Sequence, residues 1–338
     1  MRSIQTNILI IRRLVKIINL PRILNFILLS VSYIISGIRK EPYILGMPCS
    51  ISIEPTNACN LNCPECPTGT KGLSRPTGNI DQHLFENVIK EAGTKAFFLN
   101  LYFQGEPFLN RSLINLIKIA KKNRYFTSCA TNAHFITKEI ANKVILSGLD
   151  HMIISFDGTT QESYEKYRIG GNFELLVTTI KMLVEEKKKQ KQNYHIIVLQ
   201  FLILKHNEHQ IREAKEMAKS LGVDKLVFKN VQLYDLNQVN PYLPENPIHS
   251  RYIKMPDGTL RLKQTGKNRC WKSWSTCVIT WDGRVVPCCF DKDAIFCYGI
   301  LNNLSLKEIV LGKKAREFKK GILKNRKGIN ICSNCTEA

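Results

Sequence analysis

The chain is short of acidic residues, and its cysteines are not spaced as a disulfide framework would be. Its 338 residues hold 28 Asp and Glu against 49 Lys and Arg, so the formal net charge at pH 7 is +21. A large positive charge is typical of proteins that bind nucleic acid, an anionic membrane or an acidic substrate. The excess is diffuse, with local concentrations only at residues 181–191 and 307–327. Both segments have helical patterning, which favours ordinary solvated basic faces.

The chain also lacks a recognisable RNA-binding module and any interleaving of aromatic with basic residues. We therefore do not expect nucleic acid as a partner. A cleavable-looking signal peptide is missing as well, because Arg12, Arg13 and Lys16 break the first apolar run and no small-residue cleavage site follows it.

The N-terminal section, residues 1–45, has no uncharged run long enough to span a bilayer. Pro21 interrupts the apolar pattern, and the uncharged run 23–38 that follows holds 16 residues, where roughly 20 are needed. Two interpretations of this predicted helical arm stay open. It is a basic amphipathic segment that contacts a membrane surface, or an arm packed on the protein's own barrel or on a partner subunit.

What the chain does have is 12 cysteines in clusters, three of them within residues 59–66 and seven after residue 269, which is typical of metal ligands. The first three, Cys59, Cys63 and Cys66, have the spacing C-x3-C-x2-C in one short polar loop. Structural zinc takes four protein ligands, whereas three thiolates can hold a [4Fe–4S] cluster and leave one iron open. The loop thus predicts a cluster, with half of a zinc knuckle as the alternative.

This spacing, with Asn60-Leu61 after the first cysteine, closely resembles the signature of radical S-adenosylmethionine (radical SAM) enzymes. The resemblance implies that the three cysteines hold a [4Fe–4S] cluster whose open iron chelates the amino and carboxylate groups of SAM. It implies reductive cleavage of SAM to a 5′-deoxyadenosyl radical that takes a hydrogen from a substrate. It also implies a reductant such as flavodoxin or ferredoxin, and a reducing, cytoplasmic compartment.

Strand-like and helix-like runs alternate after residue 49, which predicts an α/β fold with a parallel sheet and outer helices. The expected strands are residues 50–54, 96–103, 126–130, 151–156, 195–204 and 225–230, and the expected helices are residues 81–92, 112–122, 138–147, 173–189 and 208–220. The resemblance implies that they form a partial (βα)6 TIM-type barrel. The cysteine loop follows the first strand, at the end of a barrel where catalytic residues belong.

Polar residues after the second and third strands resemble SAM-binding motifs of the family. The sequence Gln104-Gly105-Glu106-Pro107 resembles its Gly-Gly-Glu motif, which implies that Gly105 and Glu106 bind the SAM amino group. Thr131-Asn132 resembles a Thr-Asn-Gly turn in which Ala133 takes the glycine position. For Asn132, a ligand role and a simple turn cap both stay open.

Further candidates follow the fourth strand. Ser155 and Asp157 resemble the Ser-x-Asp-Gly element of relatives with a C-terminal extension, which implies contacts with the methionine carboxylate and the ribose. A turn capped by Asp157 is the alternative. Arg168 offers a planar cation suited to a carboxylate, although a surface arginine is an equal interpretation.

The C-terminal cysteines form a second candidate site. Asp282-Gly283 predicts a tight hairpin that brings Cys270 and Cys288 together, and Cys332 with Cys335 offers a two-thiol clip after an expected helix at residues 305–320. The four resemble the ligands of the SPASM/twitch extension of radical SAM enzymes. The C-x2-C-x5-C-x3-C run of two-cluster members is missing, so we expect one auxiliary [4Fe–4S] cluster, with zinc as the alternative. The remaining thiols, ordinary or substitutes for one ligand, are Cys277, Cys289 and Cys297.

These observations predict a helical arm (residues 1–45), a radical SAM barrel (46–235), a linker (236–269) and a SPASM/twitch domain (270–338). The predicted function is that of a radical SAM oxidoreductase or maturase of the SPASM group, with the auxiliary cluster as an electron relay. Its substrate is unidentified, either a peptide side chain or a sugar-like small molecule. The alternatives are a zinc-binding regulatory or structural protein and an RNA-modifying radical SAM enzyme.

Overall fold

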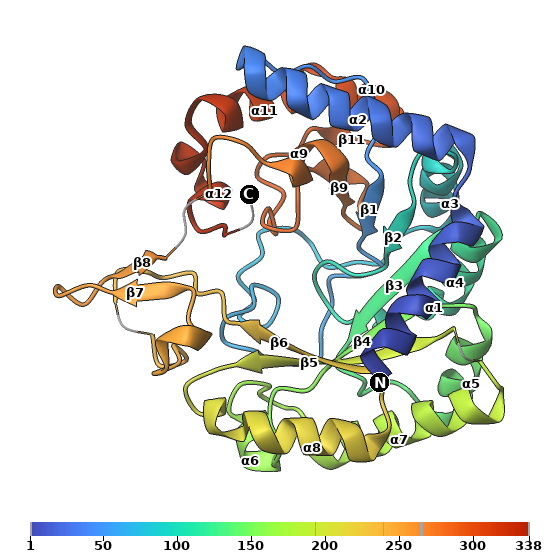
Figure 1. Ribbon diagram of the computed structural model, residues 1–338, viewed down its shortest axis with the longest axis vertical. Coiled ribbons are helices and arrows are strands. Elements are labelled where there is room, and N and C mark those ends of the chain that lie inside the picture. Colours follow the sequence, from blue (N-terminus) through green and yellow to red (C-terminus); the bar gives the residue numbers. More distant parts are fainter. Residues whose placement is uncertain (1, 193, 239, 264–265, 337–338) are drawn as a thin grey trace. The chain divides into compact units, whose positions relative to one another are not determined.

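A computed structural model describes residues 2–192, 194–238, 240–263 and 266–336. The chain divides into two compact units (Figure 1). Unit 1 comprises Met1–Ile10, Cys59–Gly72 and Cys129–Gln264, and unit 2 comprises Ile11–Ala58, Leu73–Ser128 and Thr265–Ala338. The predicted cysteine loop therefore belongs to unit 1, and the C-terminal cysteines belong to unit 2.

The sheet of unit 2 contains strands from both ends of the chain, in the order β11-β10-β9-β1-β2-β3. These are β1 (Ser50–Ile53), β2 (Phe98–Asn100), β3 (Phe126–Thr131, whose last residues belong to unit 1), β9 (Thr276–Ile279), β10 (Arg284–Val286) and β11 (Gly299–Ile300). Strand β1 pairs in parallel with β2 on one side and β9 on the other, so that Ile51 lies between Leu99 and Cys277. The predicted hairpin forms, because β9 and β10 pair antiparallel and Gly283 takes a φ of 82° in the turn.

The helices of unit 2 begin mostly where the sequence predicts. They include α3 (Gln82–Ala92), which the Asp81 side chain caps, and α4 (Leu113–Lys122). The C-terminal section adds α9 (Trp271–Ser275), α10 (Leu306–Leu311), α11 (Lys313–Asn325) and α12 (Asn330–Ser333). The prediction of one helix over residues 305–320 is wrong. Gly312 takes an extended conformation with ψ of 178° and ends α10 there. A Cβ at Gly312 would lie 2.6 Å from the Glu308 carbonyl oxygen, so the break needs glycine.

The N-terminal arm consists of α1 (Arg2–Ile17) and α2 (Leu20–Arg39). The Asn19 side chain caps α2, and Pro21 lies in its first turn, where its missing N–H costs nothing. The helix has 20 residues, longer than the uncharged run, because it includes Arg22 and Arg39. In the part of the chain that the structure describes, α2 is the one helix long and apolar enough to cross a membrane, judged by length and composition alone.

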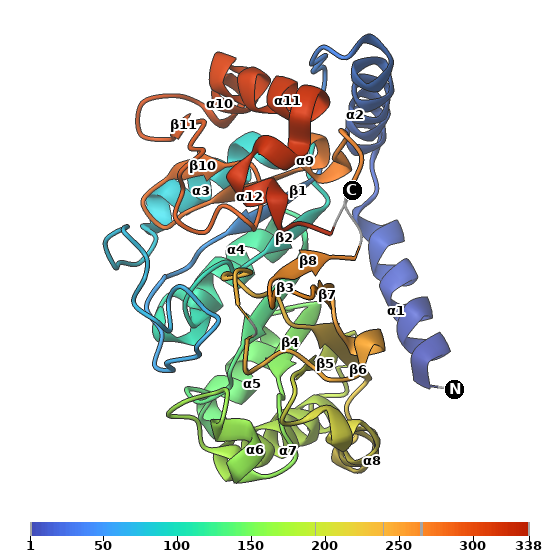
Figure 2. The same ribbon diagram turned by 90° about the vertical axis from the view of Figure 1, so that its left-hand side faces the viewer.

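Unit 1 continues the alternation of strands and helices. Its parallel strands are β4 (His151–Ser155), β5 (Ile196–Ile203) and β6 (Lys225–Asn230), and its helices are α5 (Lys138–Leu146), α6 (Gln161–Glu165), α7 (Phe173–Lys189) and α8 (Ile211–Leu221). Figure 2, turned by 90° from Figure 1, shows α6, α7 and α8 along the same side of β5 and β6. The predicted linker contains an antiparallel hairpin of β7 (Tyr252–Lys254) and β8 (Leu260–Leu262).

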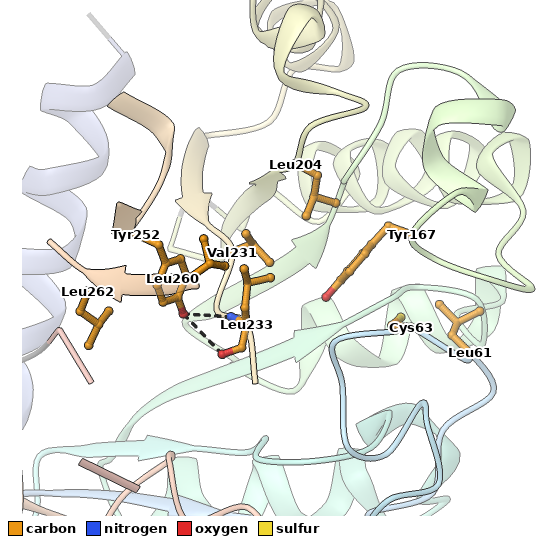
Figure 3. Packing of buried hydrophobic residues seen from close by; sticks show 9 residues of the cluster. All are labelled: Leu61, Cys63, Tyr167, Leu204, Val231, Leu233, Tyr252, Leu260 and Leu262. Carbon is orange, nitrogen blue, oxygen red and sulfur yellow. Dashed lines mark hydrogen bonds between the residues drawn. The ribbon is translucent and has the colours of Figure 1, made fainter. Parts of the chain in front are cut away.

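One hydrophobic cluster of unit 1 connects that hairpin with the cysteine loop. Figure 3 shows its nine buried members, which are Leu61, Cys63, Tyr167, Leu204, Val231, Leu233, Tyr252, Leu260 and Leu262. The backbone N–H of Leu233 donates a hydrogen bond to the Tyr252 hydroxyl at 3.0 Å. The apolar surroundings hold one thiol of the loop, that of Cys63, away from water.

Candidate active site

The cysteine loop is a tightly held turn with one thiol buried and two partly exposed. Cys63 is 4% exposed, and Cys59 and Cys66 are intermediate, with all three sulfurs free of disulfides. Within the loop, the N–H of Cys66 donates to the Cys63 carbonyl at 3.2 Å. Gly69 packs so closely on the loop that a Cβ there would lie 2.5 Å from the Cys63 backbone. This packing fixes the Cys63 backbone in a loop that carries three soft thiol donors, the ligand type that selects iron–sulfur clusters, zinc or copper(I).

A guanidinium lies at the edge of this loop. The Arg168 Nη1 donates to the Cys63 sulfur at 3.6 Å, and its Nε donates to Oδ2 of Asp157 at 2.6 Å. The other oxygen of Asp157 accepts from the Leu202 N–H at 2.6 Å, and the carboxylate is fully buried. Burial raises the pKa of the Cys63 thiol, and the Arg168 charge opposes that rise. Arg168 is thus a fixed, charged side chain beside the thiols and not a surface arginine.

Gly105 and Glu106 contact the segment that immediately precedes the first cysteine. Gly105 has a φ of 77°, and a Cβ there would lie 2.6 Å from the carbonyl oxygens of Thr56 and Ala58. The Glu106 N–H donates to the Ala58 carbonyl at 2.7 Å. Oε1 of its buried carboxylate accepts from the Phe108 N–H at 3.1 Å. The pair therefore sets the position of the residue before Cys59, whatever the carboxylate binds.

Asn132 contacts the same loop from the third predicted strand. Its Nδ2 donates to Oδ1 of Asn60 at 2.8 Å, and its own Oδ1 accepts from the His134 N–H at 3.0 Å. Ala133 has a φ of 65°, so it adopts the left-handed conformation that glycine provides in the motif it resembles. Ser155 lies at the end of β4 in register with Gln200 of β5 and is partly exposed.

The sequence analysis missed an ion pair of unit 2, in which Glu54 precedes the cysteine loop in the chain and Arg75 follows it. The Arg75 Nη1 and Nη2 donate to the two oxygens of Glu54 at 2.8 and 2.9 Å, with both side chains buried. The Trp281 N–H donates to the same carboxylate at 3.1 Å, and the Arg75 Nε donates to the Lys292 carbonyl at 3.1 Å. A glutamate that ends a buried strand was the available signal, since such a charge needs a partner.

The four C-terminal cysteines all belong to unit 2. Cys270 precedes α9, Cys288 follows β10, and Cys332 and Cys335 lie in and after α12. The pKa of Cys332 is raised to about 11, chiefly by burial, with the Arg326 charge opposing the rise and the thiols of Cys270 and Cys335 adding to it. Burial also raises the pKa of Cys288, with Cys270 and Cys332 among the neighbours that contribute. These contributions agree with a shared location of the thiols in unit 2.

The other C-terminal thiols have different surroundings. Cys277 is buried in β9, where burial raises its pKa to about 12, Cys297 donates to the Gly299 carbonyl at 3.3 Å, and Cys289 is exposed beside Cys288. Among the described residues, no three His, Cys, Asp or Glu side chains are grouped as ligands of a single metal ion.

Arg326 is a second site residue that sequence reasoning missed. It lies in the basic segment interpreted as a solvated face, yet only 2% of it is exposed. Its N–H donates to Oδ1 of Asn268 at 3.1 Å, and its guanidinium hydrogen-bonds the Cys332 thiol and lowers the pKa of that thiol. Lys319 of the same segment is also buried, 4% exposed, so the solvated interpretation is wrong for both residues. Arg326 lies just beyond α11 in a basic stretch that gives no sign of burial, whereas Lys319 shares a face of α11 with Ala315, Ile322 and Leu323, and that spacing was an available signal.

Sequence comparisons match two sections of the chain to known families. Residues 53–220 match the radical SAM superfamily, and residues 270–336 match the SPASM iron–sulfur cluster-binding domain. A tungsten-containing aldehyde ferredoxin oxidoreductase cofactor-modifying protein of Pyrococcus furiosus is 24% identical over 70% of this chain and 69% of its own. A PqqA peptide cyclase of Bradyrhizobium diazoefficiens is 25% identical over 58% and 50%. An AdoMet-dependent heme synthase of Methanosarcina barkeri is 26% identical over 64% and 62%.

Solved structures share the fold. SuiB of Streptococcus suis bound to S-adenosylmethionine matches with a TM-score of 0.62 at 14% identity, over 89% of this chain and 75% of that one. The enzyme anSMEcpe with bound AdoMet and a peptide matches with a TM-score of 0.59 at 18% identity, over 84% and 88%. These matches confirm the predicted α/β class with a mostly parallel sheet. The match to a cluster-binding domain favours iron–sulfur over zinc at the C-terminal cysteines.

Proposed function

We propose that Cys59, Cys63 and Cys66 are the ligands of the SAM-cleaving [4Fe–4S] cluster. The chain belongs to the radical SAM superfamily and carries a C-terminal SPASM domain. The protein is an enzyme, and SAM and [4Fe–4S] clusters are its cofactors. When bound and reduced, the cluster supplies the electron that cleaves SAM to a 5′-deoxyadenosyl radical. The donor set supports this assignment, because three thiols of one loop leave a coordination position for SAM.

The observation that carries the proposal is the position of Arg168. Its guanidinium is 3.6 Å from the Cys63 sulfur and is fixed by the buried Asp157 carboxylate. A planar cation suits a carboxylate better than any other side chain does. We assign Arg168 to the methionine carboxylate of SAM. Asp157, whose oxygens accept from Arg168 and from the Leu202 N–H, positions that guanidinium.

The other SAM-binding assignments are Gly105 and Glu106 for the amino group and Ser155 for the carboxylate and ribose region. The support for this assignment is that Gly105 allows the backbone to approach Thr56 and Ala58 closely and that the Glu106 N–H donates to the Ala58 carbonyl at 2.7 Å. Asn132 supports the loop by its hydrogen bond to Asn60. We assign this residue the positioning of the loop.

At the second site, we assign Cys270, Cys288, Cys332 and Cys335 to one auxiliary [4Fe–4S] cluster. Four thiolates leave no coordination position for a substrate, which suits an electron relay better than substrate binding. Arg326 places a positive charge beside Cys332, and such a charge favours the reduced form of a nearby cluster.

Two substrate classes fit, and both are proposals. A peptide side chain is supported by the relatives named as PqqA peptide cyclases and by SuiB, whose structure has been solved with a precursor peptide. The second class, a sugar-like small molecule, is supported only as a small molecule, by BtrN, solved with AdoMet and 2-DOIA, whose fold matches with a TM-score of 0.53. The relatives also include a cofactor-modifying protein and a heme synthase.

For partners and location, we propose flavodoxin or ferredoxin as the reductant and a cytoplasmic enzyme that contacts a membrane through residues 1–40. That segment contains seven Lys and Arg and no Asp or Glu. The proposed division of the chain is an arm (1–45), a barrel (46–235), a linker (236–269) and a SPASM domain (270–338). The linker carries the hairpin of β7 and β8.

The test is anaerobic reconstitution followed by iron analysis. Wild-type protein should hold about eight irons and form 5′-deoxyadenosine with dithionite and SAM. The triple variant Cys59→Ala, Cys63→Ala, Cys66→Ala should keep about four irons and form none of this product. Cys129→Ala, which removes a buried thiol of the same unit, is the matched control and should keep both. A triple variant that still cleaves SAM would disprove the assignment of the loop.

A further inference from the structure

Helix α2 has its polar residues facing the protein and its apolar residues facing outward. The buried side chains are Arg22, Asn25, Leu29, Ser32 and Ser36. The exposed ones include Leu20, Ile23, Leu24, Ile27, Leu28, Val31, Ile34 and Ile38, each at least 38% exposed. At 100° per residue the two sets lie on opposite faces of the helix. An ordinary helix of a water-soluble protein has the reverse arrangement.

The inner face holds α2 to unit 2 by hydrogen bonds to backbone. The Arg22 guanidinium donates to the carbonyls of Ile17, Gly93 and Arg124 at 2.6 to 2.9 Å. The Asn25 amide exchanges two hydrogen bonds of 2.8 Å with the Met47 backbone. Hydrogen bonds from polar side chains thus hold α2 to unit 2, where apolar packing usually holds a helix, and the apolar face of α2 remains uncovered.

Further along the helix, Ser32 accepts from the Leu45 N–H at 2.9 Å and Ser36 accepts from the Tyr43 N–H at 2.8 Å. The Tyr33 ring meets the Trp271 ring of α9 edge to face, with centroids 5.3 Å apart. Figures 1 and 2 both show α2 along the outside of unit 2 next to α9. The inner face is therefore fixed along the whole length of the helix.

We propose that α2 lies in the plane of an anionic membrane, with its outward face inserted among the lipids and unit 2 attached to its inner face. This inference rests on the membrane contact proposed above and specifies its geometry. Spanning would remove Arg22 and Asn25 from the backbone groups that they bind and place them in hydrocarbon. Unpaired polar groups there are strongly unfavourable.

Charge favours lipid over a second copy of the chain as the occupant of this face. Arg12, Lys16, Arg39 and Lys40 are exposed near the ends of the apolar face, and the first acidic residue is Glu41, which pairs with Lys320 at 2.7 Å. Basic residues beside an apolar helix face complement anionic headgroups. The residues Leu20, Leu24, Ile27, Val31, Ile34 and Ile38 have the spacing of a coiled-coil seam. Such a seam needs flanking charges of opposite sign, which α2 lacks.

The test is flotation of the reconstituted full-length enzyme with vesicles of phosphatidylcholine, with or without phosphatidylglycerol. Wild type should float with the anionic vesicles. The double variant Ile27→Gln, Ile34→Gln should lower the partition coefficient by about a hundredfold, since two half-exposed isoleucines each contribute about tenfold. Ile248→Gln, Ile295→Gln is the matched control, because these residues are 81% and 69% exposed outside the arm, and it should bind like wild type. Point variants are preferable to deletion of the arm, which would uncover the carbonyls that Arg22 and Asn25 bind.

The orientation of α2 in the membrane is tested by measuring how deeply two of its positions lie in the bilayer. Ile23→Trp and Ile34→Trp, corrected for the native tryptophans, should be quenched equally by lipids brominated at one depth. In a spanning helix the two positions would differ in depth by about 16 Å, so unequal quenching would overturn the in-plane orientation.

Two further outcomes would overturn the lipid assignment. The first is a dimer in solution that the Ile27→Gln, Ile34→Gln variant dissociates. The second is a wild-type enzyme that cleaves SAM but does not float, which leaves the radical SAM function standing. Formation of 5′-deoxyadenosine by each variant shows that it is folded.

Discussion

The two cysteine sites use the same ligand type but assemble it over different lengths of chain. Cys59, Cys63 and Cys66 lie in one loop of unit 1, while the ligands proposed in unit 2 extend from Cys270 to Cys335. A loop of a few residues can gather three thiols with little loss of chain entropy, whereas ligands more than 60 residues apart need the intervening fold to form first. Cluster loading at the C-terminal site should therefore be coupled to folding of that section.

Each site also has a guanidinium beside one thiol, and the setting of this guanidinium differs between the two sites. Arg168 donates to both the Cys63 sulfur and the Asp157 carboxylate, so its charge is balanced within unit 1. Arg326 lies beside Cys332 in a helical segment rich in lysine. We infer that the first cation serves to orient an incoming anion and that the second acts on the cluster itself.

The largest expected effect separates the roles of the two sites. The double variant Cys332→Ala, Cys335→Ala should lose about four of about eight irons and should form no oxidised product from a substrate. It should still form 5′-deoxyadenosine with dithionite, because the loop in unit 1 is unchanged. Iron analysis and chromatography measure both, with near-wild-type circular dichroism as the control for folding. A folded double variant that turns over substrate normally would leave the C-terminal cysteines a purely structural role.

The second effect tests the ion pair beside the loop. Asp157→Asn should lower the free energy of unfolding by about 3 kcal/mol, because it leaves the largely buried Arg168 without its counter-charge. It should also raise KM for SAM, since the guanidinium loses its orientation. Urea denaturation measures the change in the free energy of unfolding. Glu139→Gln breaks an exposed pair with Lys143 and should change stability by less than about 0.5 kcal/mol. Equal effects of the two variants would contradict the positioning role.

Acid should weaken unit 1 more than unit 2. Six of the seven histidines lie in unit 1, and burial lowers the pKa of His195 to about 4. Its ring stays neutral in the fold, whereas the unfolded chain takes up a proton below about pH 6.5. The unfolding free energy should therefore fall by about 2 kcal/mol from pH 6.5 to pH 5, at 1.36 kcal/mol per pH unit. His195→Asn should flatten this slope in urea titrations, and an unchanged slope would exclude His195 as its source.

The smallest expected effect concerns the turn beside the loop. Ala133→Gly should raise the unfolding free energy by about 0.5 kcal/mol, because relief of a left-handed alanine slightly exceeds the loss of one buried methyl group. Ala130→Gly, in the strand just before it, should instead destabilise the protein. Guanidinium denaturation measures the unfolding free energy of both variants, provided that its dependence on denaturant concentration is unchanged. Destabilisation by both variants would mean that the φ of 65° carries no strain.

Local patterns predicted the elements and the position of the loop well, since their information lies within a few residues. The six predicted strands have counterparts in β1–β6, and the predicted helix at residues 173–189 has the bounds of α7. The prediction of a hairpin at Asp282-Gly283 is confirmed for the same reason, because a tight turn depends on its own two residues.

Long-range contacts were not predictable in this way. Nothing near Arg326 in sequence indicates burial, since it lies in a basic stretch and is buried only by what packs on it. Lys319 shares a helix face with Ala315, Ile322 and Leu323, but a lysine on such a face usually extends its charge into water. The pairing of Arg75 with Glu54 has the same origin, because the two residues are neighbours only after the loop has folded. The ligand assignments themselves stay predictions, to be tested by iron analysis.

The parallel pairing of β1 with β9 has a consequence for any attempt to divide this enzyme. Each residue of β1 from Ser50 to Ile53 is in register with one of β9, and β9 begins only at Thr276. A protein cut before Cys270 would have β1 as a bare edge strand, with the alternately buried Ile51 and Ile53 beside unpaired backbone groups. Such an edge recruits other chains, so the isolated barrel should aggregate during synthesis. The C-terminal section thus protects the first strand of the catalytic barrel, in addition to anything its cysteines bind.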